Sequence, residues 1–330
     1  MRLAIVGVGA IAQAHAAAIA AAPGVELVFA VDPRPEAAAA MAEAHDATAL
    51  ASCEELVARA AQVDGAIVCT PPSTHEEVSG ALLRAGLHVL CEKPLAITSD
   101  AAARMVAGAH AAGRSLVMAS KFRYVDDLLK AKAMIASGAI GAPISFENAF
   151  TSRVSMAGRW NADPGVSGGG VVIDNGTHSV DIARFLFGPV VEVLAVEARR
   201  LQAISVEDSA TMLVRTAAGV TGSIDLSWSI DKRQQDWIRI HGAEGTIAIG
   251  WAVSAVRRSS APDWEPMGHG YDKVAAFAAV LADFVGAATE GRPARIGVAD
   301  ALASVYVIEA AHRSLRRVAW EPVEGATLST

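Results

Sequence analysis

A glycine turn near the amino terminus constrains the fold of this chain more than any other feature. Residues 3–6 are apolar, Gly7 and Gly9 follow at once, and an alanine-rich helical pattern begins after them. In such a strand–turn–helix, the first glycine permits the tight turn, the second lets the backbone approach a pyrophosphate, and Ala12 allows close packing. The amino end of the helix offers N–H groups to phosphates. The turn predicts a dinucleotide site that includes Gly7, Gly9, Ala10 and Ile11.

The second predicted strand, residues 25–31, ends in Asp32. A carboxylate at this place hydrogen-bonds a ribose 2′-hydroxyl and repels a 2′-phosphate, which favours NAD. Arg34 offers the opposite interpretation, because a guanidinium binds a 2′-phosphate. Asp32 as a plain turn residue before Pro33 agrees less well with the preceding strand and glycine turn. We therefore predict NAD as the cofactor, with NADP as the alternative.

Strand and helix patterns alternate through the first 120 residues. Further strands are predicted at residues 64–69, 88–91 and 115–119, with helical patterns at residues 36–44, 53–60, 76–85 and 99–112. This alternation is typical of βαβ units and a parallel sheet. We expect an α/β fold with an N-terminal NAD(P)-binding Rossmann domain over residues 1–121.

Strand patterns dominate after the turn at residues 138–143, and two helices follow at residues 273–289 and 298–315. Residues 220–230 show the clearest period of two. One face carries Val220, Ile224, Leu226, Trp228 and Ile230, and the other carries Thr221, Ser223, Asp225, Ser227 and Ser229. This period predicts a sheet with one apolar and one polar face. We expect a C-terminal α/β domain over residues 122–330 with a large, open, mostly antiparallel sheet, whose last helix packs back on the first domain.

The predicted strand at residues 88–91 is followed by Glu92, Lys93 and Pro94. Pro94 has no backbone N–H, so the strand ladder ends there. Ligands of open parallel sheets bind beyond the carboxyl ends of the strands. Lys93 is therefore expected beside a bound substrate, although the same Glu-Lys pair in isolation is more typical of a solvated loop.

Asp174 and His178 are four residues apart in a helical pattern that follows the glycines at residues 168–170. On a helix they share one face, and both are expected to project from its first turn. A carboxylate beside an imidazole raises the pKa of the histidine and orients it as a general base. The alternative is that Asp174 is an N-cap and His178 a satisfied, half-buried histidine.

Composition excludes several function classes. The chain has 330 residues, a net charge of -7 and a hydrophobic fraction of 52%. The acidic balance argues against nucleic-acid or anionic-membrane surfaces.

Cys53, Cys69 and Cys91 have no metal-ligand spacing, so we predict free thiols, a reducing cytoplasm and no metal. Arg2 and the apolar run after it resemble a secretion signal, but cleavage near Ala20 would remove the glycine turn.

The ordered set of motifs resembles the glucose–fructose oxidoreductase / inositol dehydrogenase (Gfo/Idh/MocA) family over essentially the full length. The matching motifs are Gly7-x-Gly9-x-x-Ala12, Glu92-Lys93-Pro94, Trp160, Asp163-Pro164, Gly168-Gly-Gly-x-x-x-Asp174-x-Gly176-x-His178-x-x-Asp181 and Ile240-x-Gly242-x-x-Gly245. Each motif alone is modest, and their order carries the resemblance.

The resemblance implies an NAD(P)-dependent oxidoreductase acting on a secondary hydroxyl or carbonyl of a sugar, polyol, inositol or sugar acid. Its catalytic residues correspond to Lys93, Asp174 and His178. His178 would take the proton, Lys93 would stabilise a developing alkoxide, and Asp174 would orient His178 or bind a neighbouring hydroxyl. The resemblance also implies a cis peptide bond between Lys93 and Pro94.

The same resemblance implies further contacts. Thr70, Pro71, Ser73 and His75 would flank the nicotinamide and its ribose, with Glu92 near the cofactor, although Pro71 and Pro72 are equally typical of a rigid turn. Candidate substrate residues are Lys121, Arg123, Arg153 and Trp160, with Asp174 and His178. The four cations Lys121, Arg123, Arg153 and Arg159 suggest an acidic substrate. The alternative is that the arginines are solvated surface residues, as arginines most often are.

Two other functions share these motifs. One is a hydrolase or epimerase that uses NAD transiently, and the other is a non-enzymatic, dinucleotide-bound sensor. Intact Lys93, Asp174 and His178 argue against the sensor. By resemblance, we expect a homodimer or homotetramer with a small carbohydrate-like substrate and no nucleic-acid or membrane partner.

Overall fold

The computed structural model describes residues 1–325, which form two compact units. The first unit holds Met1–Lys121 and Lys273–Leu302, and the second holds Phe122–Asp272 and the chain from Ala303. The break after Lys121 coincides with the boundary expected from the sequence. We expected residues 273–302 in the second domain, and they group with the first unit instead.

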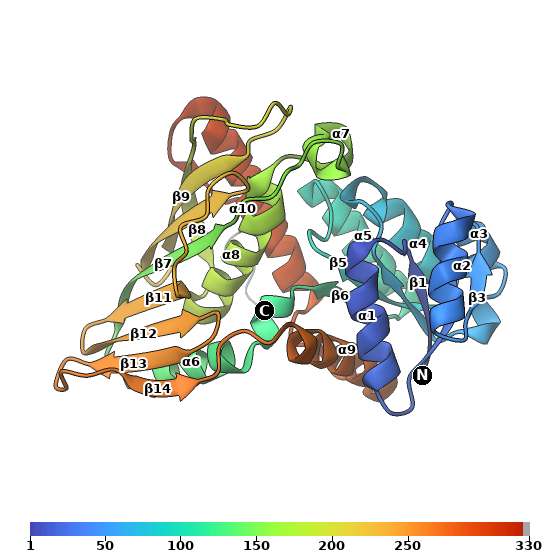
Figure 1. Ribbon diagram of the computed structural model, residues 1–330, viewed down its shortest axis with the longest axis horizontal. Coiled ribbons are helices and arrows are strands. Elements are labelled where there is room, and N and C mark those ends of the chain that lie inside the picture. The colour runs from blue at the N-terminus through green and yellow to red at the C-terminus, as the bar shows by residue number, and fades with distance from the viewer. Residues whose placement is uncertain (326–330) are drawn as a thin grey trace. The chain divides into compact units, whose positions relative to one another are not determined.

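The first unit is built on a six-stranded parallel sheet with the order β3-β2-β1-β4-β5-β6 (Figure 1). Its strands are β1 (Arg2–Val6), β2 (Glu26–Val31), β3 (Thr48–Leu50), β4 (Gly65–Val68), β5 (His88–Glu92) and β6 (Leu116–Ala119). Its helices are α1 (Ala10–Ala21), α2 (Pro35–Ala44), α3 (Cys53–Val57), α4 (His75–Arg84), α5 (Ser99–Ala112) and α9 (Lys273–Glu290). This is the doubly wound strand order of dinucleotide-binding domains, and it confirms the predicted Rossmann fold.

Local sequence explains most of these boundaries. The Ser52 hydroxyl accepts a hydrogen bond from the Glu55 N–H at 3.3 Å and caps α3, as predicted. Gly113 ends α5 with a φ of 61°, a left-handed conformation that favours glycine. Strand β3 escaped prediction because three residues carry too little periodicity to distinguish a strand from a loop.

Helix α9 joins the first unit through apolar packing. The Phe277 ring meets the His15 ring of α1 edge-on at 4.9 Å, and Phe284 is fully buried. A side chain at Gly65 of β4 would come within 3.3 Å of the Phe284 ring. These contacts place a helix from late in the sequence on a sheet formed early, which sequence order does not indicate.

The second unit holds a nine-stranded sheet with the order β14-β13-β12-β11-β7-β10-β9-β8-β15. Its strands are β7 (Pro143–Thr151), β8 (Val190–Glu197), β9 (Ser209–Thr216), β10 (Thr221–Ser227), β11 (Asp236–Gly242), β12 (Gly245–Gly250), β13 (Ser254–Arg258), β14 (Glu265–Gly268) and β15 (Glu321–Pro322). Within this sheet the β7–β10 pair is parallel, and every other pairing between its described strands is antiparallel. The expected mostly antiparallel sheet is therefore confirmed.

The remaining α-helices of the described residues are α6 (Asp126–Ala136), α7 (Pro164–Ser167), α8 (Val171–Phe187) and α10 (Val298–Arg317). Helix α8 lies along one face of the large sheet (Figure 1) and packs on β10, where a side chain at Gly176 would come within 3.1 Å of Leu226. The expected apolar face of β10 is buried at Ile224 and Leu226. Ile230 lies beyond the end of β10 and is 41% exposed, so it is not part of that face.

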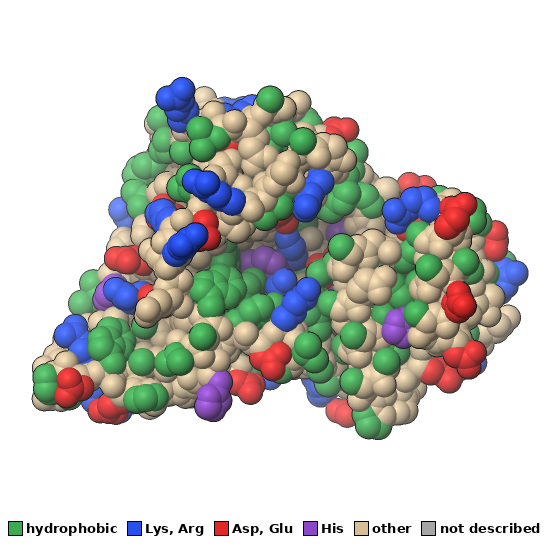
Figure 2. Space-filling model, in the orientation of Figure 1, with side chains coloured by type: hydrophobic (Ala, Val, Ile, Leu, Met, Phe, Trp, Pro, Cys, Tyr) green, Lys and Arg blue, Asp and Glu red, His purple; other side chains and the backbone are tan. Residues whose placement is uncertain are grey.

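Within residues 1–325, no helix combines the length and apolar character needed to cross a membrane. The same residues contain no group of three or more His, Cys, Asp or Glu side chains arranged to hold a metal ion. On the face drawn in Figure 2, the described Lys and Arg side chains lie among Asp and Glu side chains and do not merge into a continuous basic surface.

The assignment of α9 to the first unit is tested by Phe284→Ala. Removing a fully buried ring leaves a cavity, so we expect the free energy of unfolding in urea to fall by about 3–5 kcal/mol. The control is Val274→Ala on the same helix, where the side chain is 71% exposed and the change is expected within about 0.5 kcal/mol. Equal effects of the two variants would contradict the packing of α9.

Candidate active site

The glycine turn joins β1 to α1 as predicted. Gly7 has a φ of 86°, and a side chain there would come within 2.8 Å of the backbone of Cys69 and Thr70. A side chain built on Gly9, the N-cap of α1, would meet nothing within 4 Å. No side chain caps the N–H groups of this first turn and none of its residues is acidic. The turn therefore leaves space and free backbone donors for a pyrophosphate.

Asp32 follows β2 and is almost fully buried. Its carboxylate accepts hydrogen bonds from the Val8 N–H at 3.0 Å and from Arg34 Nε and Nη2, both at 2.8 Å. The Arg34 hydrogen bond is the main cause that lowers the pKa of Asp32 to about 2. The carboxylate is therefore ionised at neutral pH and contacts the glycine turn through the Val8 N–H, where it suits a ribose hydroxyl. Arg34 is occupied by Asp32, which disfavours its use as a 2′-phosphate clamp.

Glu92 and Lys93 follow β5 as predicted, and the Lys93–Pro94 peptide bond is cis, which confirms that expectation. The Glu92 side chain points inward, where its Oε1 lies 2.8 Å from His15 Nε2 and its Oε2 accepts the Lys93 N–H at 3.1 Å. Burial raises the pKa of Glu92, but His15 and the charges of Lys93 and Lys121 outweigh it and hold the pKa below its ordinary value. Glu92 therefore fixes the backbone of Lys93 through the hydrogen bond to its N–H.

The loop after β4 lies beside the glycine turn. Thr70 and Pro71 are half-buried and Ser73 is exposed, so these three remain candidates for cofactor contact. His75, at the start of α4, is 1% exposed, and its ring nitrogens lie 2.9 Å from the carbonyl oxygens of Pro94 and Thr70. We expected His75 to flank the cofactor. The structure buries it because α4 starts there and turns the ring inward.

Asp174 and His178 both lie on α8, four residues apart and on one face. The N-cap of α8 is Gly170, so the alternative that Asp174 caps the helix is wrong. His178 lies two turns into the helix rather than in its first turn, because α8 begins at Val171. His178 is 6% exposed, which fixes the position of its ring within the second unit.

A distant carboxylate caps α8. Glu207, which precedes β9, accepts the N–H groups of Gly170 and Val172 at 2.9 and 3.1 Å. A side chain at Gly170 would come within 2.0 Å of the Glu207 carbonyl oxygen, which explains the glycine there. Sequence reasoning missed Glu207, because a capping residue normally stands next to its helix.

Two aromatic rings, those of Phe122 and Phe150, lie beside His178 within the second unit. The His178 ring meets the Phe122 ring edge-on at 5.0 Å, and Phe122 lies 4.7 Å from Phe150 and 4.9 Å from Tyr271 between ring centroids. Sequence reasoning did not single out any of these three aromatic residues. They lie far apart in the sequence, so only the fold brings Phe122 and Phe150 to the imidazole and Tyr271 to Phe122.

The four predicted substrate residues other than Asp174 and His178 lie in different environments. Arg123 is 2% exposed and donates through Nε to Asp181 at 3.2 Å, so it is not available to a substrate. Lys121 is half-buried in the first unit, with its ammonium 5.5 Å from the centre of the Phe277 ring. Arg153 and Trp160 are exposed on the second unit. The pairing with Asp181, itself part of the family motif, argues against the predicted substrate contact of Arg123.

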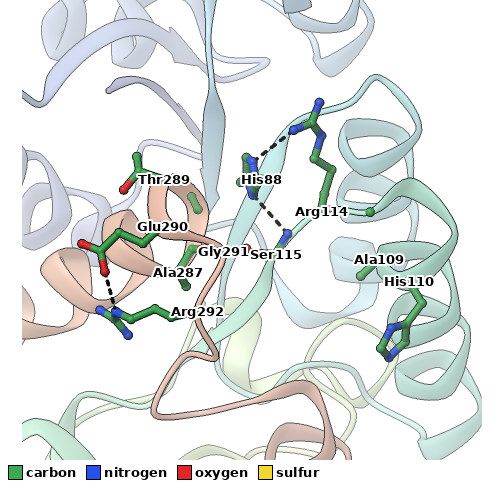
Figure 3. A pocket seen from close by; sticks show the side chains of 12 residues that line it. His88, Ala109, His110, Arg114, Ser115, Ala287, Thr289, Glu290, Gly291 and Arg292 are labelled. Carbon is green, nitrogen blue, oxygen red and sulfur yellow. Dashed lines mark hydrogen bonds and ion pairs between the residues drawn. The ribbon is translucent and has the colours of Figure 1, made fainter.

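The first unit also has a hollow of about 580 Å³ at the amino ends of β5 and β6, opposite the glycine turn (Figure 3). The Ser115 N–H donates to His88 at 3.1 Å, and Arg292 lies 3.3 Å from Glu290. Cofactors of parallel sheets bind at the carboxyl ends of the strands. We therefore assign this hollow no part in cofactor binding.

Two family models match the chain. "Oxidoreductase family, NAD-binding Rossmann fold" matches residues 1–120, and "GFO/IDH/MocA C-terminal domain" matches residues 128–248. Inositol 2-dehydrogenase of Acidothermus cellulolyticus is 30% identical over 96% of this chain and 93% of that enzyme. D-apiose dehydrogenase of Paraburkholderia graminis is 30% identical over 74% of this chain and 66% of that enzyme.

A solved structure agrees with these matches. GenD2 from gentamicin A biosynthesis, in complex with NAD, is 26% identical with a TM-score of 0.88, and the match covers 98% of this chain and 97% of that one. The open Gly7–Gly9 turn, the ionised Asp32 and the parallel sheet suit the same cofactor. The chain therefore belongs to the Gfo/Idh/MocA family of NAD-binding oxidoreductases, and it is an NAD-dependent dehydrogenase.

Proposed function

We propose that this dehydrogenase oxidises a secondary hydroxyl of a neutral sugar or polyol, with Lys93, Asp174 and His178 as its catalytic residues. The observation that carries the proposal is Lys93 itself, held at the carboxyl end of β5 by the buried Glu92 and followed by a cis proline. The named substrates of the relatives, inositol and D-apiose, support a polyhydroxylated substrate.

NAD, when bound, accepts the hydride, and the residues of this chain handle the proton and the orientation. His178 takes the hydroxyl proton as general base. The Lys93 ammonium donates a hydrogen bond to the same oxygen and stabilises the negative charge that develops on it. Asp174, one helical turn before His178, orients the imidazole or accepts a hydrogen bond from a neighbouring hydroxyl.

For the cofactor, we propose that Gly9, Ala10 and Ile11 bind the pyrophosphate and that Asp32 binds the ribose. Thr70, Pro71 and Ser73 are proposed to line the nicotinamide side. A neutral substrate is favoured over a sugar acid by the substrates named for the relatives, inositol and D-apiose, and the pairing of Arg123 with Asp181 weakens the argument for an anion. Trp160 and Arg153 remain proposed substrate contacts.

The compartment and the assembly are also proposals. Three cysteines without a disulfide support a reducing cytoplasm, and recovery of the protein from another cell fraction would contradict it. The sheet face opposite α8 exposes Leu213 and Val196, which are 41% and 48% exposed. These side chains support association of copies through that face into a homodimer or homotetramer.

The assembly prediction is tested by light scattering. We expect a mass of two or four chains of 34.0 kDa at micromolar concentration, and a shift toward the monomer in Leu213→Asp, because a buried unpaired carboxylate disfavours association. The matched control is Leu201→Asp, at an exposed position outside the strands. A monomeric peak for the unmodified protein contradicts the proposal.

The catalytic residues are tested by NADH formation across inositols, sugars, polyols and sugar acids. Lys93→Ala is expected to lower kcat by about 10²–10³-fold, since it removes a donor to the developing charge. His178→Asn is expected to lower kcat by about 10²–10⁴-fold through loss of the base. Lys232→Ala, on the surface, should leave turnover unchanged.

The outcomes separate the functions. Conversion of a substrate without net formation of NADH would favour a hydrolase or epimerase that uses NAD transiently. Tight NAD binding with no conversion of any compound, and no effect of Lys93→Ala on a cellular response, would favour a sensor.

Cofactor choice is tested by Asp32→Ser. The change removes the ribose acceptor and releases Arg34, so the ratio of kcat/KM for NADP to that for NAD is expected to rise by at least about tenfold. Glu36→Ser, in the exposed first turn of α2, is the control and should leave the ratio unchanged. A ratio that stays constant in Asp32→Ser would show that Asp32 does not select the cofactor.

A further inference from the structure

His75 is a buried imidazole between two carbonyl oxygens. It is 1% exposed at the start of α4. Its Nδ1 lies 2.9 Å from the Pro94 oxygen, and its Nε2 lies 2.9 Å from the Thr70 oxygen. Both distances are those of full hydrogen bonds, and both neighbours are acceptors only.

The neutral form of the ring has too few N–H groups to donate a hydrogen bond to both acceptors. A neutral imidazole carries one N–H, so at any moment it donates to one carbonyl and turns a lone pair toward the other. Only the imidazolium donates to both. Burial lowers the pKa of His75, against the opposing effect of the carbonyls of Thr70, Pro94 and Leu95 and of the charge of Glu92. At neutral pH the ring therefore holds one proton for two partners.

The two carbonyls belong to the two segments that matter for the reaction. The Thr70 backbone lies against the Gly7 turn, since a side chain on Gly7 would come within 2.8 Å of it. The Pro94 carbonyl follows the cis bond to Lys93, whose N–H is held by Glu92. His75 is thus the direct hydrogen-bond link between the loop after β4 and the loop after β5.

We propose that His75 is a positioning residue that shares one imidazole proton between the Thr70 and Pro94 carbonyls. Its Nε2–H tautomer holds the cofactor loop, and its Nδ1–H tautomer holds the segment of Lys93. Each loop is therefore fixed by a different nitrogen of the same ring. The proposal rests on the proposed roles of Thr70 in cofactor binding and of Lys93 in catalysis.

Two substitutions of His75 each keep only one of its two hydrogen bonds. The amide N–H₂ of Asn occupies the place of Nδ1, so His75→Asn keeps the bond to Pro94 and loses the bond to Thr70. The longer Gln places its N–H₂ near Nε2, so His75→Gln keeps the bond to Thr70 and loses the bond to Pro94.

His75→Asn is expected to raise the Kd of NAD, measured by calorimetry, by about tenfold and to leave kcat within about twofold. His75→Gln is expected to lower kcat by about tenfold and to leave the Kd of NAD within about twofold. Equal losses of NAD affinity and kcat in both variants, tracking their melting temperatures, would overturn the proposal in favour of a merely structural histidine.

A second readout does not depend on turnover. The rate at which acetic anhydride acylates Lys93, measured by mass spectrometry against the exposed Lys232, should change in His75→Gln and stay constant in His75→Asn. If no compound is oxidised by the unmodified protein, the proposed function fails, while NAD affinity and Lys93 labelling still test His75.

If neither variant folds, the proposal is tested by a measurement on the unmodified protein. In ¹⁵N-histidine-labelled enzyme, the ring nitrogens of His75 should show intermediate chemical shifts that report two exchanging tautomers. One nitrogen with the shift of a permanently protonated atom and the other with that of a bare atom would overturn the shared proton.

Discussion

The close approach of the Gly7 turn to the end of β4 is the contact on which the cofactor-binding unit depends. Any side chain at Gly7 would lie 2.8 Å from the backbone of Cys69 and Thr70, and backbone atoms at the end of a central strand have little freedom to move. With that contact in place, β1 and β4 run in register and their carboxyl ends meet at one edge. Asp32, Thr70 and Lys93 follow β2, β4 and β5 of the same parallel sheet, so they lie at this edge.

Buried ionisable side chains in both units contact partners that are far away in the sequence. His15 of α1 meets Glu92 after β5, and Arg123 meets Asp181 of α8. An unpaired charge at either place would cost several kcal/mol by burial alone. These pairs stabilise one arrangement of each unit. They also explain why conspicuous polar residues such as Arg123 are not available for a ligand.

The proposed catalytic residues are Lys93 in the first unit and Asp174 and His178 in the second, and within each unit hydrogen bonds to the backbone fix the segment that carries them. Glu92 accepts the N–H of Lys93, and His75 lies within hydrogen-bond distance of the carbonyl oxygen of the next residue, Pro94. Glu207 caps the helix that carries Asp174 and His178, and two aromatic rings lie beside the imidazole. Rigid support of this kind is what a dehydrogenase needs, since positioning is its main contribution to hydride transfer.

The family resemblance implied the cis Lys93–Pro94 bond. The sequence by itself determined the two folds, the NAD-type turn, and the helical spacing of Asp174 and His178. These depend on short-range periodicity, glycine conformation and residue spacing, which the chain carries locally. Only the tertiary structure decided that α9 joins the first unit, that Arg123 and His75 are buried, and that Glu207 caps α8. Each of these depends on contacts between residues distant in sequence, and a local pattern contains no information about which distant group will fill a buried donor, acceptor or cavity.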